Sequence, residues 1–357
     1  MAGSVPRTPP AVLALLLTLL VVPAAGGAGT ARAADGAARV VTEVKISERI
    51  LDLAVAAPEL DAPVKWVRLL VPKGWSKTAG RTWPTLWLLH GSGGSHLDWT
   101  TKTHVERLTA GREVMVVMPE TSGCGGYSDW WNFGRGGAPA WETYLLGELR
   151  PLLERDYRAG PRRAVAGLSM GGLGALKLAA AHPGVFRAVA SYSGAANPLY
   201  KSPDGGLSGP DAVKLAALSC LADWRRIWGE PGYPFDTTDP ADVRQRALWE
   251  RNSPLYQARR LAGTPLYLSY GDGTDSGPGW AWGDPAPSPS RCVDPPVHGG
   301  DDLLEAAVHG MNRQLRDRLS QLGIPATVCA SRGAHAWSYW ERELVASFPM
   351  LMRSLGA

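Results

Sequence analysis

The stretch RRAVAGLSMGGLGALKLAAAHP (residues 162–183) decides the fold. Its opening RRAVAG (162–167) is a short apolar run typical of a buried strand, and MGGLGALKLAAAHP (170–183) has apolar residues at helical spacing. Between them, GLSMG (167–171) matches G-x-S-x-G, the pattern of a sharp strand-to-helix turn that exposes a serine hydroxyl. The pattern in this setting predicts an α/β-hydrolase fold with Ser169 as a nucleophile.

Strand-like and helix-like segments alternate around this stretch, as they do in α/β folds. Residues 41–48 and 64–72 are predicted to be antiparallel strands at the start of a sheet. Near-continuous apolar runs predict central strands at 85–91, 113–119, 162–167 and 186–194, and 265–272 and 325–331 complete the sheet. Helical spacing predicts helices over 142–157, 170–183 and 302–322. We therefore expect a mostly parallel sheet flanked by helices.

Two stretches depart from this alternation. Residues 195–264 carry Pro, Gly and several Trp between two strands, and we interpret them as an insertion or cap over the catalytic edge. Residues 273–300 are rich in Pro and Gly and predict a long irregular loop. Because no internal repeat is present, we interpret residues 34–357 as a single domain that includes both stretches.

The N-terminus has the pattern of a secretory signal peptide. Arg7 precedes the apolar run AVLALLLTLLVV (11–22), and Ala31-Arg32-Ala33 resembles a cleavage site. We assign residues 1–33 to this leader and expect a secreted or extracellular protein, compatible with attachment to a cell wall; an uncleaved anchor is the alternative. No other stretch of the sequence is a candidate membrane span, because a span needs about 20 apolar residues.

Composition sets further bounds. With 45% apolar and 20% charged residues in 357, the chain has the balance of a globular enzyme. A formal charge of +4 without a basic stripe argues against a nucleic-acid partner. Export would allow disulfide bonds to form, and the four cysteines permit three full pairings. Cys329 could either form a disulfide or remain a buried free thiol. No metal-spaced cluster is present, so neither a metal nor an organic cofactor is expected; the oligomeric state stays undetermined.

A nucleophilic serine needs a base and an acid, which in α/β-hydrolases follow it along the chain. His335 follows the last predicted strand, where a catalytic loop leaves the sheet, so we prefer it to the other histidines, which are His182, His298 and His309. Three carboxylates remain open as the acid: Asp272, Asp275 and Glu305.

The oxyanion hole requires two main-chain N–H groups. We expect one from Met170, next to the nucleophile, and one from Ser92 in the turn HGSGG (90–94). Several of the 15 tryptophans, namely Trp99, Trp130, Trp131 and Trp337, fall in loops expected to border the site. Their rings suit acyl chains or sugar faces, and Trp99 and Trp337 are candidate substrate-binding residues.

An ordered set of motifs resembles the secreted antigen 85 mycolyltransferases within the larger esterase D-like family of esterases. The set runs LLHGSGG (88–94), YSDWW (127–131), WETYL (141–145), GLSMGG (167–172), HPGVF (182–186), WERNSP (249–254), YGDGT (270–274) and HAWSYW (335–340). The resemblance covers roughly residues 40–355. It implies that Glu305, in the segment LLE (303–305), is the triad acid.

The resemblance also implies where this chain differs from the antigen 85 branch. An aspartate and an arginine that bind trehalose there correspond here to His90 and Gly93, which makes His90 a candidate substrate-binding residue. We therefore predict an acyl-ester hydrolase or acyltransferase acting on an ester or lipid, with water, a sugar or glycerol as acceptor. The alternatives are a trehalose mycolyltransferase proper, a serine peptidase and a non-catalytic exported binding protein on the same scaffold.

Overall fold

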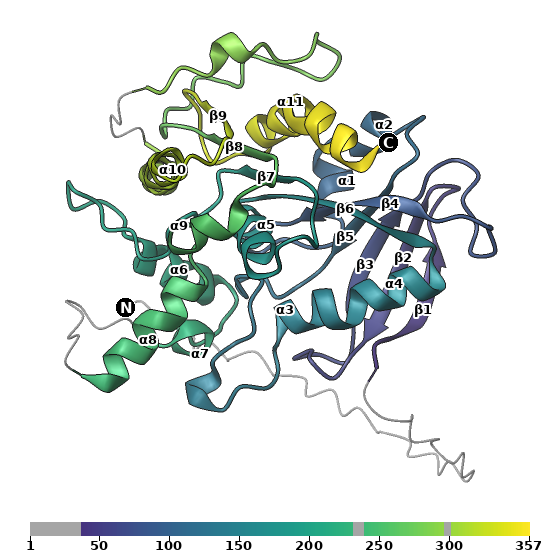
Figure 1. The fold of residues 1–357 in the computed structure, drawn as a ribbon, viewed down its shortest axis with the longest axis horizontal. Coiled ribbons are helices and arrows are strands. Elements are labelled where there is room, and N and C mark those ends of the chain that lie inside the picture. The colour runs from purple at the N-terminus through teal and green to yellow at the C-terminus, as the bar shows by residue number, and fades with distance from the viewer. Residues whose placement is uncertain (1–36, 231–238, 296–300) are drawn as a thin grey trace, which may run out of the picture. The chain divides into compact units, whose positions relative to one another are not determined.

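The computed structural model describes residues 37–230, 239–295 and 301–357. These residues form one compact unit (Figure 1). The predicted leader (residues 1–33) and His298 lie outside the described residues. Within them, no helix is both long and apolar enough to cross a membrane.

A nine-stranded sheet forms the centre of this unit. Its strands, in the spatial order β1-β2-β3-β5-β4-β6-β7-β8-β9, are β1 (Arg39–Lys45), β2 (Ile50–Ala56), β3 (Lys65–Leu70), β5 (Met115–Pro119), β4 (Trp83–Leu89), β6 (Ala159–Leu168), β7 (Val189–Tyr192), β8 (Leu266–Tyr270) and β9 (Thr327–Ala330). The first three strands and the β3–β5 pair are antiparallel, and every pair from β5 to β9 is parallel. The sheet is thus mostly parallel, as the sequence predicts.

Helices cover both faces of this sheet. They are α1 (Asp98–Lys102), α2 (Val105–Leu108), η1 (Asn132–Gly134), α3 (Trp141–Thr143), η2 (Tyr144–Leu149), α4 (Arg150–Asp156), α5 (Met170–Ala181), α6 (Gly209–Ser219), α7 (Arg225–Trp228), α8 (Pro240–Arg251), α9 (Pro254–Gln257), η3 (Ala258–Leu261), η4 (Pro289–Arg291), α10 (Leu303–Gln321) and α11 (Trp337–Leu355).

The alternation of side chains along β6 divides the core in two. Val165 packs in the cluster that contains Leu176 of α5. Its neighbours Ala164 and Ala166 pack in the cluster that contains Leu351 of α11. Because successive residues of a strand point to opposite faces, an apolar β6 buries both of its faces. Figure 1 shows α5 and α11 on opposite sides of the sheet.

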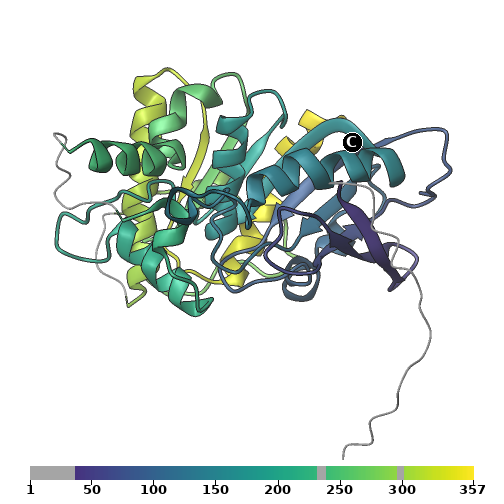
Figure 2. The ribbon, with the colours of Figure 1, turned by 90° about the horizontal axis from the view of Figure 1, so that it is seen from below.

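The structure differs from the sequence prediction in several elements. The buried strand β2 and the 19-residue helix α11 were not predicted. The predicted helix 142–157 is three consecutive segments, α3, η2 and α4, of which η2 is a π-helix. Residues 195–264 contain α6 to α9 and η3, and Figure 2 shows these green helices at the end of the unit opposite the purple first strands.

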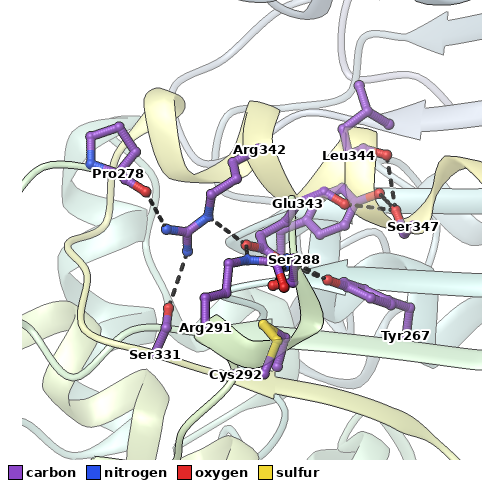
Figure 3. A network of polar contacts seen from close by, with 12 residues as sticks. Tyr267, Pro278, Ser288, Arg291, Cys292, Ser331, Arg342, Glu343, Leu344 and Ser347 are labelled. Carbon is purple, nitrogen blue, oxygen red and sulfur yellow. Dashed lines mark hydrogen bonds and ion pairs between the residues drawn. A yellow bond between two sulfur atoms is a disulfide. The ribbon is translucent and has the colours of Figure 1, made fainter. Parts of the chain in front are cut away.

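The predicted irregular loop is tied to the sheet by a disulfide and an ionic network. Of residues 273–295, only Pro289–Arg291 form a helical turn. Cys292, next in the chain, is bonded to Cys329 of β9, so Cys329 is a bridge and not a free thiol. Glu343 of α11 accepts hydrogen bonds from Arg291 (2.8 Å), Arg342 (2.7 Å) and Tyr267 (2.5 Å), as Figure 3 shows.

This network yields a stability prediction. Glu343→Gln removes the carboxylate that neutralises two guanidinium groups in a largely buried setting, and breaking such a pair costs about 3–5 kcal/mol. We expect the free energy of unfolding, measured with urea, to fall by that amount. The control Glu113→Gln, whose exposed carboxylate pairs with exposed Arg81, should change it by less than about 1 kcal/mol. Equal stability of the two variants would contradict this account.

Candidate active site

The turn between β6 and α5 holds Ser169 in a strained conformation. Its φ is 52° and its ψ is −121°, which is uncommon for a residue other than glycine. Glycines on both sides make the turn possible. A Cβ on Gly167 would lie 2.2 Å from the Gly171 carbonyl oxygen, and a Cβ on Gly171 would lie 2.3 Å from that of Leu89. The turn thus depends on close contact between main chains.

His335 and Glu305 meet Ser169 from two other parts of the chain. His335 lies in the loop between β9 and α11, and its Nε2 is 2.8 Å from Ser169 Oγ. Its Nδ1 is 2.5 Å from Oε2 of Glu305, which is fully buried in the first turn of α10. Because a carboxylate only accepts hydrogen bonds, Nδ1 carries the proton and Nε2 accepts from the serine hydroxyl.

Groups at the carboxyl ends of β7 and β8 fix the Glu305 carboxylate. Its Oε1 accepts hydrogen bonds from Ser193 Oγ (2.7 Å) and from the Gly271 amide (2.6 Å). The indole of Trp340 donates to Ser193 Oγ (3.1 Å), which leaves the serine proton to point at the glutamate. The remaining oxygen of Glu305 faces His335.

Asp302 links the acid-bearing helix to the histidine loop. Its Oδ1 accepts from the Glu305 amide (3.0 Å) as the N-cap of α10, and its Oδ2 accepts from the His335 amide (2.7 Å). Sequence reasoning missed both Asp302 and Ser193. The Asp302-x-x-Glu305 spacing, an N-cap signature, is a signal that could have found the aspartate.

The other candidate acids and bases lie elsewhere. Asp272 accepts from the amides of Thr274 and Gly333, and Asp275 accepts from the Tyr339 hydroxyl. His182 pairs with Glu142. His309 is fully buried, hydrogen-bonds the Gly271 carbonyl, and has its pKa lowered by burial. None of these groups contacts Ser169.

The turn after β4 lies against the nucleophile. Ser92 and Met170, the two expected oxyanion donors, both line the cavity beside Ser169. Among the residues that the structure describes, neither amide donates to another main-chain carbonyl. The Gly93 amide donates to the Gly123 carbonyl (2.8 Å), which anchors this turn to the loop after β5.

The expected substrate-binding residues fall in three different positions. Trp337 lines the cavity, whereas Trp99 is fully buried. The ring centroids of Trp99 and Trp337 are 5.4 Å apart. His90 is 1% exposed. Its Nδ1 donates to the Gly91 carbonyl (2.7 Å), its Nε2 accepts from the Thr121 amide (3.1 Å), and burial lowers its pKa. Because both ring nitrogens of the buried His90 are already hydrogen-bonded, neither is available to a substrate.

A largely apolar cavity of about 430 Å³ opens over Ser169, a size typical of small-molecule sites. Its walls come from the nucleophile turn, the insertion and α10. The lining residues include Leu173, Ala212, Val213, Ala216, Trp228, Val308 and Met311. Asp98 is also among the lining residues, and its Oδ2 accepts from the Ser95 amide (3.2 Å).

The fold is that of an α/β-hydrolase, which confirms the predicted fold class. Residues 59–351 match the family model described as Putative esterase, and the chain belongs to that family. The resemblance inferred from the motifs is thereby confirmed.

The curated relatives that are 30% identical to this chain include two whose names state an activity. One is an esterase of Mycobacterium tuberculosis, matched over 279 residues that cover 76% of this chain and 52% of the relative. The chain thus spans about half of that protein's length. The other is the diacylglycerol acyltransferase/mycolyltransferase Ag85B of Mycobacterium leprae, matched over 298 residues that cover 79% of each.

Two solved structures share the fold at lower identity. MPT51 of Mycobacterium tuberculosis superposes with a TM-score of 0.61 at 20% identity, over 87% of this chain and 100% of that one. An S-formylglutathione hydrolase from Agrobacterium tumefaciens gives 0.60 at 17% identity, over 89% and 99%.

The contacts of the two carboxylates predict unequal effects of their removal. Glu305→Gln should lower kcat for a p-nitrophenyl ester by up to about 10⁴-fold, because the amide neither fixes the imidazole tautomer nor stabilises the imidazolium. Asp272→Asn keeps an oxygen acceptor for both of its amide donors and should cost less than about tenfold. A larger loss of kcat in Asp272→Asn than in Glu305→Gln would indicate that the catalytic acid is the residue after β8.

Proposed function

We propose that this protein is an exported serine-dependent enzyme that cleaves or transfers acyl groups from esters through an acyl-enzyme. The observation that carries the proposal is the continuous hydrogen-bonded set Ser169–His335–Glu305 at the base of an apolar cavity. No metal or organic cofactor enters the mechanism.

In the first step, Ser169 Oγ attacks the ester carbonyl while His335 Nε2 takes its proton. The imidazolium that forms is stabilised by Glu305, whose position is held by Ser193 and Gly271. The amides of Ser92 and Met170 are assigned to the developing oxyanion, a contribution that typically amounts to about 10²–10³ in rate for one donor. The alcohol then leaves with the proton from His335.

In the second step, water or an alcohol attacks the acyl-enzyme while His335 takes its proton; the bond to Ser169 Oγ then breaks, and His335 returns the proton to that oxygen. The apolar walls from α6, α10 and Trp337 favour an acyl chain over a charged group in this cavity. Asp98, the carboxylate of the lining, is suited to bond a hydroxyl of an alcohol acceptor such as a sugar or glycerol.

The relatives support this activity, and the site weakens the binding-protein and peptidase alternatives. An esterase and an acyltransferase/mycolyltransferase are both 30% identical to the chain. A purely binding protein has no need for a buried glutamate and a histidine aligned on a strained serine, and nothing in the cavity specifies a peptide. We therefore retain ester hydrolysis or acyl transfer as the function.

Export is part of the proposal. The leader pattern at residues 1–33 motivates it. The Cys292–Cys329 disulfide supports it, because such bonds persist mainly in oxidising compartments.

A fluorophosphonate probe tests the nucleophile. We expect it to label the protein at one serine, which peptide mass spectrometry should identify as Ser169, and Ser169→Ala should abolish the label. The matched control Ser92→Ala keeps the main-chain amide assigned to the oxyanion hole and should still be labelled. Labelling that survives in Ser169→Ala would overturn the mechanism.

Acceptor choice is the second test. We predict that trehalose is not a strongly preferred acceptor, because His90, which is buried, and Gly93, which is exposed, supply neither a carboxylate nor a guanidinium. A site without such hydrogen-bonding partners can lose up to about 10⁴–10⁵ in discrimination. The measurement is the partition of the acyl group of a p-nitrophenyl ester between water and added trehalose, glucose or glycerol. Saturable transfer to trehalose far above the other acceptors would restore the trehalose mycolyltransferase alternative.

A further inference from the structure

Two free cysteines meet beside the cavity although they are far apart in the sequence. Cys124 is buried in the loop after β5, and Cys220 is the half-buried C-cap residue of α6. Burial and, after it, the neighbouring Cys220 thiol raise the pKa of the Cys124 thiol. Cys220 Sγ lies 3.1 Å from the position that a Cβ on Gly123 would occupy. The sulfur of the helix end therefore rests directly on the loop that carries Cys124.

These cysteines connect two parts of the candidate active site. The Gly123 carbonyl holds the Gly93 amide, next to Ser92 of the assigned oxyanion hole. Cys124 itself lines the cavity. On the other side, α6 provides cavity-lining residues such as Val213 and Ala216. A bond between the sulfurs would join the cavity wall to the loop behind the oxyanion turn.

We propose that Cys124 and Cys220 are a second disulfide site, and that the bond between them fixes the α6 wall to the active-site loop. The helix needs such a tether. Leu215, which lines the cavity, is 56% exposed, and Leu218, which does not line it, is 65% exposed. Side-chain packing therefore stabilises α6 less than it does the helices of the core.

The bond forms by thiol–disulfide exchange with an external disulfide, such as a thiol oxidase of the export compartment or oxidised glutathione. Cys220, the more exposed sulfur, attacks as the thiolate, and one external thiolate leaves. Burial raises the pKa of the Cys124 thiol, which makes it the less reactive of the two thiols, so Cys124 acts second. There, after losing its proton to solvent, Cys124 attacks Cys220 Sγ and releases the second external thiolate. Two protein thiols are oxidised, and one external disulfide is reduced to two thiols.

The test uses the mature chain treated with oxidised glutathione, alkylated with iodoacetamide and mapped without reduction. We expect a cross-linked peptide pair that joins Cys124 to Cys220, beside the pair that joins Cys292 to Cys329. The intact mass should be lower than that of the reduced chain by four hydrogen atoms. The readout is covalent and does not require ester cleavage, so its failure is distinct from a failure of the proposed function.

Thermal unfolding of Cys220→Ser provides the second measurement, because this variant keeps the Cys292–Cys329 bond. The proposed bond closes a loop of about 95 residues, so oxidised wild type should unfold about 5–10 °C above oxidised Cys220→Ser. After reduction the two proteins should unfold at the same temperature. Full alkylation of Cys124 and Cys220 after oxidation, a cross-link to another cysteine, or a difference that persists after reduction would each overturn the proposal.

Discussion

The backbone at Ser169 is the constraint on which the site depends. A positive φ at a residue with a side chain is unfavourable by itself, and contacts between β6, α5 and the end of β4 maintain it. Gly167 and Gly171 leave no space for a Cβ on either side of the serine. The turn therefore presents the hydroxyl above the sheet, and every other part of the site is arranged around that point.

The carboxyl ends of adjacent parallel strands supply this arrangement. β6, β7 and β8 are neighbours in register, and the residues just beyond their ends are Ser169, Ser193 and Gly271. Two of these hold Glu305, so the acid is oriented by the same sheet edge that carries the nucleophile. Asp302 then links the helix that carries the acid to the loop that carries the histidine. This link fixes the histidine relative to the serine and the glutamate.

Local patterns in the sequence predicted the parts of the fold that local rules control. The turn at Ser169, the central parallel strands and α10 follow from periodicity and from glycine spacing. Helix α11 escaped prediction because its interior contains Pro349, which normally ends a helix. The bridge between Cys292 and Cys329, and the contacts of Ser193 and Asp302, join segments that only the strand order brings together. For the acid, spacing left three carboxylates open, and the family resemblance favoured Glu305.

The central claim is that Ser169 carries the acyl group during turnover. Rapid mixing with a slowly deacylating p-nitrophenyl ester, followed by acid quench and intact-protein mass spectrometry, measures this intermediate directly. The account predicts a transient mass increase equal to one acyl group, located on the peptide that contains Ser169 and formed as fast as the burst of p-nitrophenol. A burst with no adduct on that peptide, or an adduct on another residue that forms at the burst rate, would contradict it.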